Sequence, residues 1–239
     1  MQPAEINLPI DPTFDFRSEV PAGRDPDSWS PTLRSYHRLL WSKPLPDGRT
    51  FDLTEEGKPG GYFLRHDSAL GTFRLTSDTI THRYLRTAVA KQIPAAALPT
   101  DIGYTIASAL VFPGTRVDGK QTINQARGTH PRIRDRFDLT LECIRRHYQE
   151  EDNPLRAVLT RYSSFFELFV DFDGYVDFFL LHDVIGDDGK IAYWHHFDNF
   201  TTPPVPNDVD AYLAYRRHTS DFIRARNKRI ADATPGIPS

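Results

Sequence analysis

The sequence predicts a single domain of the α+β class, in which a small antiparallel or mixed sheet packs against several amphipathic helices. Three observations favour this class. Segments with apolar residues at helical spacing occur beside short segments rich in β-branched and aromatic residues. These segments do not alternate in the strict rhythm of a doubly wound sheet. The length of 239 residues suits one large domain or two small ones.

An extended arm is predicted for residues 1–30, which carry five prolines and little periodicity. Proline removes a backbone donor and disfavours helix, so we expect the arm to lie on the surface of the domain. Its expected anchors are Phe14, Phe16 and Trp29. The domain itself is expected to cover 31–230. It begins with a helix over 31–43, because Ser30 suits the N-cap and proline suits the first helical position.

The first half of the domain is expected to supply the sheet. Residues 61–66 and 72–76 predict two short strands joined by a turn. A helix is predicted over 79–92, where a proline two residues later stops it. Residues 103–113 have the strongest β pattern in the chain, and a Pro-Gly pair closes that strand.

The second half predicts mainly helices. Apolar residues recur at helical spacing from Ile133 to Tyr148 and again over 155–169. Asn207 or Asp208 is suited to cap a last helix that ends near Ile230. Residues 231–239 are expected to form a tail.

A β-hairpin is predicted between 176 and 197, closed by the turn Gly-Asp-Asp-Gly, although 174–185 can instead prolong the preceding helix. In the hairpin, Ile185 pairs with Lys190, and His182 shares a face with His195. Two histidines on one face suit a metal or a proton-transfer pair. No third ligand is visible at short spacing, so we expect ordinary cross-strand packing and no metal.

Composition excludes several classes. A net charge of −3 argues against a sequence-blind nucleic-acid coat protein, which needs many cations. The single cysteine, Cys143, excludes an intramolecular disulfide and is expected to be buried and structural. Phosphate-loop and dinucleotide motifs are absent, so no cofactor is expected. Without an apolar run of ~18 residues, we expect a soluble, cytoplasmic protein with no membrane partner.

The densest functional signal is the segment 116–148, which holds eight Lys and Arg against four acids. Basic side chains before a helix start favour an anion site, because the first backbone N–H groups are unpaired there. The candidate ligand-binding residues are Lys120, Asn124, Arg127, Arg134 and Arg146, with His130 as the candidate catalytic acid or base. The alternative is a solvated loop followed by a helix with ordinary ion pairs from Glu142 to Arg145 and Arg146.

Arg127 is the sharpest of these candidates. If 121–128 forms a helical turn, Asn124 and Arg127 project from one face. A guanidinium held there pairs either with an internal carboxylate or with an anionic ligand. We favour the ligand.

Two further motifs have stronger structural explanations. Glu142-x-x-Arg145 resembles the Glu/Arg pair of ribosome-inactivating N-glycosidases, but the flanking residues do not fit, which favours a helical salt bridge. Asp171-x-Asp173-Gly174 resembles the first motif of haloacid-dehalogenase-type phosphatases. It follows a helical period rather than a strand, so we expect a helix end with glycine at the C-cap.

The runs TINQARG, DRFDLTLECIRRHY, RYSSFFELF and GYVDFFLLHDVI resemble a family of bacterial proteins of similar length and unknown function. LWSKPLP and FIRARNKRI extend the resemblance over nearly the whole chain. It implies that these segments belong to one unit, and it supplies no activity or catalytic residues.

Two functions are therefore carried forward. The first is binding, with turnover as a further step, of a phosphorylated small molecule, a nucleotide or RNA. The aromatic residues available to stack on bases are Trp41, Tyr104 and Trp194. The second is a non-catalytic interaction module that buries the arm and the last helix against a partner or a second copy. Its expected contact residues are Tyr212, Tyr215 and Phe222. We favour the first.

Overall fold

The computed structural model describes residues 10–80, 87–98 and 102–234. Its α-helices, 3-10 helices (η) and strands follow one another as η1 (Phe16–Glu19), α1 (Pro26–Trp29), α2 (Pro31–Trp41), β1 (Lys43–Pro44), β2 (Thr50–Phe51), β3 (Thr54–Glu56), β4 (Phe63–Ser68), β5 (Gly71–Thr79), η2 (Ala90–Gln92), η3 (Ala95–Ala97), η4 (Ile106–Ser108), β6 (Ala109–Pro113), α3 (Ile123–Thr129), α4 (Phe137–Tyr148), α5 (Arg156–Arg161), α6 (Ser163–Phe166), η5 (Glu167–Phe169), α7 (Phe172–Phe178), η6 (His182–Val184) and α8 (Val209–Ala233).

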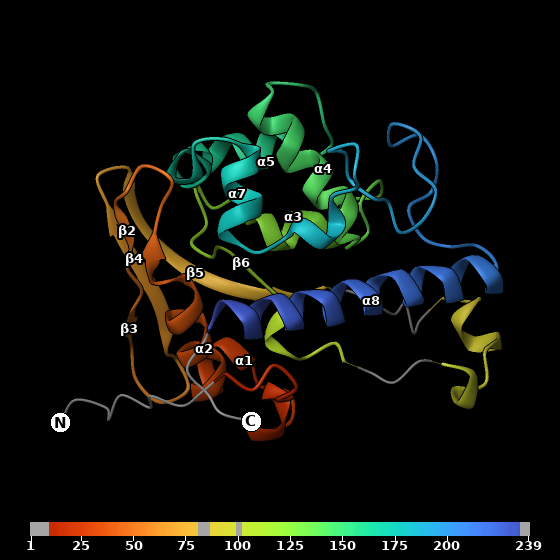
Figure 1. The fold of residues 1–239 in the computed structure, drawn as a ribbon, viewed down its shortest axis with the longest axis horizontal. Coiled ribbons are helices and arrows are strands. Elements are labelled where there is room, and N and C mark those ends of the chain that lie inside the picture. The colour runs from red at the N-terminus through yellow and green to blue at the C-terminus, as the bar shows by residue number, and fades with distance from the viewer. Residues whose placement is uncertain (1–9, 81–86, 99–101, 235–239) are drawn as a thin grey trace.

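A four-stranded antiparallel sheet in the order β3-β4-β5-β6 forms one flank of the molecule (Figure 1). The long strand β5 pairs with β4 across a tight turn and with β6 at its other end, where Thr79 faces Ala109. All five residues of β6 are buried, as expected for a strand covered on both faces. The short strands β1 and β2 form a separate antiparallel pair.

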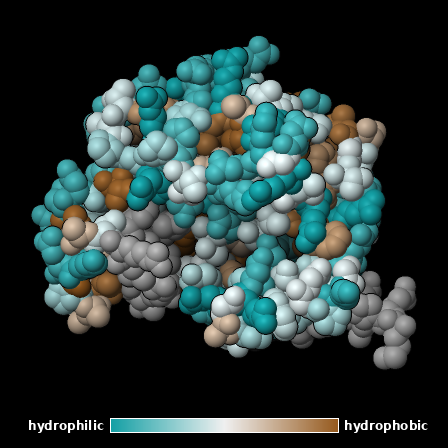
Figure 2. Space-filling view, turned by 180° about the vertical axis from the view of Figure 1, so that it is seen from behind, coloured by the Kyte–Doolittle hydropathy of each residue, from teal (hydrophilic) through white to brown (hydrophobic). Residues whose placement is uncertain are grey.

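Helix α8 runs through most of the length of the molecule, with α3, α4, α5 and α7 on one side and α1 and α2 on the other (Figure 1). Asp208 caps it by accepting a hydrogen bond from the backbone N–H of Ala211 at 2.8 Å. Hydrophilic residues cover most of the opposite face of the molecule, and hydrophobic ones form small separated groups there (Figure 2). None of the helices in the described ranges has the length and the apolar surface that crossing a bilayer requires.

Aromatic rings fasten the helices to one another. The fully buried Trp41 of α2 lies 5.3 Å, ring centre to ring centre, from Phe179, and Phe169 lies 5.0 Å from Phe178. Such edge-to-face and tilted pairs add to the free energy gained by burying the rings. The core is therefore built around large, rigid side chains, as the Phe-rich composition suggests.

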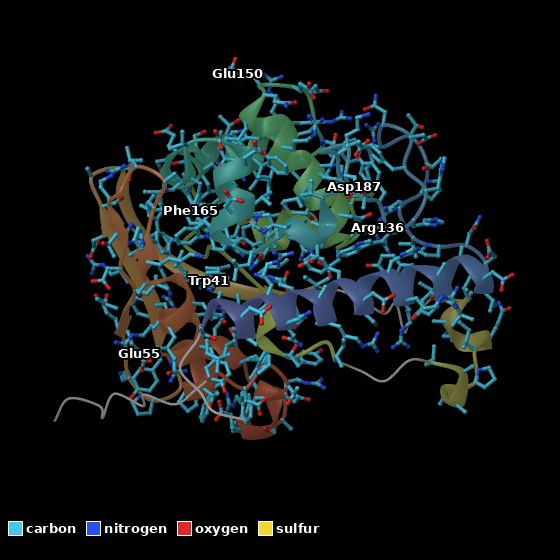
Figure 3. All side chains as sticks on the ribbon, in the orientation of Figure 1. Trp41, Glu55, Arg136, Glu150, Phe165 and Asp187 are labelled. Atoms are coloured by element: carbon cyan, nitrogen blue, oxygen red, sulfur yellow. The ribbon has the colours of Figure 1, made fainter. Side chains whose placement is uncertain are left out.

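Arg226 of α8 connects three distant segments through its buried guanidinium. It donates hydrogen bonds to the backbone oxygens of Ala107 at 2.7 Å, Ala109 at 3.0 Å and Phe179 at 2.9 Å. The guanidinium also lies over the ring of Trp41, 5.8 Å from its centre. Trp41 is labelled beside α8 in Figure 3. Burial lowers the pKa of Arg226 to about 10, so it stays charged at neutral pH. Charge-assisted bonds to carbonyl groups thus hold the centre of the fold.

The α+β class predicted from the sequence is confirmed. The predicted helices 31–43 and 208–230 correspond to α2 and α8, and the predicted strands 61–66 and 72–76 correspond to β4 and β5. In each case a cap or a tight turn coincides with a clear apolar period, so that local and tertiary preferences agree.

Three boundary predictions were wrong in part. The predicted helix 79–92 does not begin at Thr79, because Thr79 is the last residue of β5 and pairs with β6. Residues 81–86 lie outside the described residues. Among the described residues of this segment only η2 is helical. The predicted strand 103–113 begins only at Ala109, after η4. The predicted helix 155–169 breaks at Tyr162, whose ψ is 23°, into α5, α6 and η5. Tertiary contacts override the local pattern at these places.

The predicted hairpin at 176–197 is also wrong. The described backbone forms α7 and η6 there, and only one isolated bridge, Ile185 to Ile191, remains of the expected ladder. His182 therefore does not share a strand face with His195. Its Nε2 instead lies 2.6 Å from a carboxylate oxygen of Asp177 on the preceding helix. Consecutive aromatic residues in this segment suit a buried helix as well as a strand, which periodicity alone cannot distinguish.

The N-terminal arm is partly helical where it is described, because η1 and α1 lie within it. Pro26 occupies the first position of α1, where the missing N–H costs nothing. Phe16 is buried, and Phe14 packs against the core 6.4 Å from the ring centre of Tyr36. Two of the three expected anchors therefore pack in the hydrophobic core, while Trp29 is half-buried. Residues 1–9 lie outside the described residues.

Candidate functional site

An open cleft of about 430 Å³ lies between the second half of α4, the start of α7 and the loop that follows η6. We call it the α4–α7 cleft. Its lining residues are Glu142, Arg145, Tyr148, Gln149, Asp171, Phe172, Asp173, Gly189, Lys190, Ile191 and Tyr193. Clefts of this size that combine aromatic walls with a few convergent polar groups are the usual sites of small ligands.

Local structure explains why these side chains converge. Arg145 follows Glu142 on α4 by three residues, and Gln149 follows Glu142 by seven residues at the C-cap of the same helix. The three side chains therefore share one face of the helix. Asp171 caps α7 by accepting a hydrogen bond from the backbone N–H of Gly174 at 2.8 Å. The predicted C-cap role of Gly174 is therefore wrong: the residue lies in the first turn of α7, where a Cβ would come within 2.2 Å of the Phe169 carbonyl oxygen.

An ionic network forms the floor of the cleft. The carboxylate of Glu142, whose side chain is 3% exposed, accepts hydrogen bonds from Arg145 at 2.9 Å and from Arg146 at 2.6 Å. Burial alone raises the pKa of Glu142, but the bonds from the two guanidinium groups outweigh it and bring the pKa below its usual value. Glu142 is therefore ionised at neutral pH. Arg145 also donates to the side-chain oxygen of Gln149.

Two tyrosines supply ring faces and neutral hydroxyl groups. Burial raises the pKa of Tyr193, and the neighbouring charge of Glu142 raises it further. Burial likewise raises the pKa of Tyr148, whose hydroxyl donates to the backbone oxygen of Phe166 at 2.8 Å. Both phenols therefore keep their protons at physiological pH, and their rings offer apolar faces to the cleft.

The backbone is strained at the edge of this cleft. Val170, immediately before Asp171, has φ 71° and ψ −59°, and the N–H of Asp171 donates to the carbonyl oxygen of Phe169 at 2.8 Å. This geometry is the rarer and more strained form of the γ-turn. A β-branched residue pays more for positive φ than glycine does. The side chain of Val170 is 60% exposed, so burial of this side chain does not offset the strain. Strained backbone conformations of this kind are found most often at functional sites.

Arg127 does not lie in the α4–α7 cleft. Its guanidinium is completely buried and lies 2.6 Å from a carboxylate oxygen of Asp78 and 2.7 Å from one of Asp135. It also donates to the backbone oxygen of Asp135 and to the hydroxyl of Thr140. Of the two alternatives for Arg127, the geometry therefore favours the internal carboxylate. The helical turn expected around Asn124 and Arg127 is present as α3.

The other predicted site residues are spread over the surface. Lys120 is exposed in the turn before α3, and Asn124 donates to the hydroxyl of Thr76 at 3.3 Å. His130 accepts from the backbone N–H of Arg132 at 3.2 Å, and burial lowers its pKa. Arg134 lies in the loop before α4 with φ 46°. Arg146 reaches the floor network through Glu142 without lining the cleft. Their ligand-binding and catalytic roles stay predictions.

The aromatic residues expected to stack on bases are mostly enclosed. Trp41 is 0% exposed and Trp194 is 5% exposed, so neither offers a ring face to a ligand. Cys143 is buried in the middle of α4, as expected, and burial raises the pKa of its thiol. No group of three or more His, Cys, Asp or Glu side chains in the described ranges is arranged to hold a metal ion.

A serine, a histidine and an aspartate meet elsewhere without forming a nucleophile. Nε2 of His37 lies 2.9 Å from the hydroxyl of Ser77, which also contacts the carboxylate of Asp27. The indole N–H of Trp41 donates to Nδ1 of His37 at 3.0 Å. Since Nδ1 is an acceptor, the imidazole proton of the neutral ring is on Nε2 and points at Ser77. His37 cannot accept the serine proton, and burial lowers its pKa to about 3.

The buried carboxyl group of Asp27 should make the free energy of unfolding depend on pH. Burial raises its pKa from 3.8 to about 7, against the hydrogen bonds from Ser77. Between those values the folded protein binds a proton that the unfolded chain does not. Its contribution to the free energy of unfolding is therefore complete below about pH 4 and is lost as the pH rises through 7. Replacing Asp27 with Asn should reduce the decline between pH 4.5 and 7.5, by at most about 1.4 kcal/mol per pH unit.

Urea unfolding at four pH values in this range measures the effect. Asp187→Asn, at an exposed position, is the matched control and should leave the slope unchanged. An Asp27→Asn protein with the slope of the wild type would show that Asp27 is ionised throughout the range.

The sequence suggests only part of this cleft. Ion pairs from Glu142 to Arg145 and Arg146 were predicted, but as ordinary surface pairs. Tyr193, Gln149 and the wall at 171–173 were missed. The signal for the wall was available, because Asp three residues before Gly at the start of an apolar turn is an N-cap pattern.

No curated protein and no solved structure matches the chain. A family model matches residues 10–230, which include both walls and the floor of the α4–α7 cleft. The chain therefore belongs to a family of unknown function (DUF6994).

Proposed function

We propose that this protein binds a small polyhydroxylated ring, a sugar or the sugar part of a larger molecule, in the α4–α7 cleft. The observation that carries the proposal is the composition of the lining. The aromatic rings of Tyr148, Phe172 and Tyr193 share the cleft with the planar polar groups of Glu142, Arg145 and Gln149.

The chemistry of a sugar matches both kinds of group. One face of a pyranose or furanose ring carries C–H groups, which pack on aromatic rings. Its edge carries neighbouring hydroxyl groups, which planar carboxylate, guanidinium and amide groups bind in pairs. Because Glu142 and Arg145 hold each other in place, they need little reorganisation when a ligand arrives.

An anionic ligand fits this cleft less well. Three carboxylates line it, from Glu142, Asp171 and Asp173, against two cations, from Arg145 and Lys190. Arg145 is engaged by Glu142, and Lys190 lies 3.5 Å from a carboxylate oxygen of Asp188. A phosphate would have to displace these internal partners. Binding of a phosphorylated small molecule or RNA at the 120–134 segment stays a separate prediction.

The interaction-module alternative loses part of its support. The three aromatic residues of α8 that were expected to contact a partner, Tyr212, Tyr215 and Phe222, are at most 3% exposed within the chain itself. A homo-oligomer formed through these side chains would require α8 to leave its core position. We therefore prefer the ligand-binding function.

Saccharide binding should be detectable with the isolated protein. A panel of mono- and disaccharides screened by saturation-transfer NMR should yield at least one ligand whose affinity calorimetry can measure. Gln149→Ala should lower the affinity for that ligand about tenfold, which corresponds to a loss of about 1.4 kcal/mol of hydrogen-bond free energy. Gln149 is exposed at the end of α4, so its replacement should leave the folded protein intact.

Gln92→Ala, at an exposed position in η2 that does not line the cleft, is the control and should bind like the wild type. The panel should include inorganic phosphate and nucleotides. Saturable binding of phosphate with no saccharide bound at millimolar concentration would contradict the proposal.

A further inference from the structure

A second cleft, of about 370 Å³, opens beside the first. It lies between the end of α4 and the helices α5 and α6, and we call it the α5–α6 cleft. Its lining residues are His147, Tyr148, Glu150, Glu151, Arg156, Thr160, Ser163, Phe166, Glu167 and Val170. Glu150 stands at the outer end of α4, where the chain turns back toward α5 (Figure 3).

The two clefts are neighbours on the same part of the surface. Tyr148 lines both of them. The strained turn separates them on the other side, because Val170 lines the second cleft and Asp171 lines the first. Tyr148 and the turn at 169–171 thus form a wall shared by the two clefts, each of which is large enough for a sugar-sized group.

The second compartment is acidic. Glu150, Glu151 and Glu167 line it against one permanent cation, Arg156. Glu151 reaches Arg145 at 3.4 Å, but among the described residues neither Glu150 nor Glu167 has an ion pair. Burial lowers the pKa of His147, so its ring adds no charge at neutral pH. A ligand group placed here meets two carboxylates whose charge no neighbour neutralises.

We propose that the α5–α6 cleft binds an amine-bearing part of the same ligand, so that the natural ligand is an aminated glycoside spanning both clefts. The inference rests on the proposed function, because the α4–α7 cleft holds the neutral sugar ring. Tyr148 lies between the two parts of the ligand and contacts both. Both an ammonium group and a hydroxyl group can donate hydrogen bonds to Glu150 and Glu167, but only the ammonium group adds a charge–charge attraction.

A matched pair of disaccharides tests this inference. Cellobiose and a derivative that carries an amine in place of the C2 hydroxyl of one ring share the β-1,4 linkage, and the other ring stays neutral. Wild-type protein in calorimetry at low salt should bind the amine derivative at least tenfold more tightly than cellobiose. The ratio should fall as salt screens the charges.

The double variant Glu150→Gln/Glu167→Gln should bring that ratio close to one and leave the affinity for cellobiose unchanged. Asp210→Asn/Asp232→Asn, which removes the same charge from exposed positions on α8, should keep the wild-type ratio. If cellobiose binds and the amine gives no advantage, or if the Glu variant keeps the advantage, this inference is wrong and the proposed function stands. If no saccharide binds, both are wrong.

Discussion

Asp138→Asn is expected to destabilise the protein by about 3–5 kcal/mol, the cost of breaking a buried ion pair. Asp138 and Arg136 are both 0% exposed and form a bidentate pair at the start of α4. The same carboxylate accepts from the backbone N–H of Trp194 at 3.0 Å. Arg136 in turn donates to the backbone oxygens of His195 at 3.0 Å and Pro204 at 3.1 Å. Asparagine keeps the shape but leaves a guanidinium buried without its countercharge.

Equilibrium urea unfolding measures this loss. Asp221→Asn is the control, because Asp221 pairs with Arg224 at 2.9 Å on the exposed face of α8 and should contribute at most about 1 kcal/mol. The double variant Arg136→Met/Asp138→Leu should be less destabilised than the sum of the two single changes, since neither charge is then left unpaired. A loss below about 1 kcal/mol for Asp138→Asn would mean that water reaches this pair.

Arg127→Met is expected to cost about 3 kcal/mol, toward the lower end of the range for buried pairs. The side chains of its partners Asp78 and Asp135 are 32% exposed, so water can solvate them in part once the guanidinium is gone. The hydrogen bonds to Thr140 and to the backbone of Asp135 are lost as well. The melting temperature should fall by several degrees in the absence of any ligand.

Thermal unfolding with and without phosphate separates the structural role from the ligand role. A structural Arg127 lowers the melting temperature of the ligand-free protein, and phosphate changes it little in either protein. An unchanged melting temperature in Arg127→Met, together with phosphate stabilisation of the wild type alone, would restore the ligand hypothesis. Arg132→Met, at an exposed position in the next loop, serves as the control.

The sequence predicts those helices whose ends are set by a capping residue and whose apolar residues recur at helical spacing. The helix at 31–41 follows from Ser30 and Pro31, and the last helix from Asp208, because each cap coincides with an apolar period. The segment 172–184 could not be assigned, since its run of buried aromatic residues has no period that separates helix from strand. Its helical state depends on packing against Trp41 and Phe169.

The candidate site shows the same division. The ion pairs on α4 could be predicted because their partners are three and four residues apart. The role of Arg127 could not, because Asp78 lies 49 residues earlier in the chain. A local excess of basic residues indicates charge but does not tell whether a distant carboxylate buries it. Tyr193 likewise reaches the cleft through the loop that follows η6, and no spacing in the sequence indicates this contact.

The contacts of Arg226 have a consequence for how the chain folds during its synthesis. The carbonyl groups of Ala107 and Ala109 accept hydrogen bonds from Arg226, which lies 119 and 117 residues later in the chain. At translation rates of about 5 to 20 residues per second, that interval is roughly 6 to 24 seconds. During this time η4, which packs against α8 in the folded protein, and Ala109 at the start of β6 lack this partner. The hydrogen bonds of Arg226 can therefore form only after α8 has been synthesised, which places the closing of the centre of the fold late in folding.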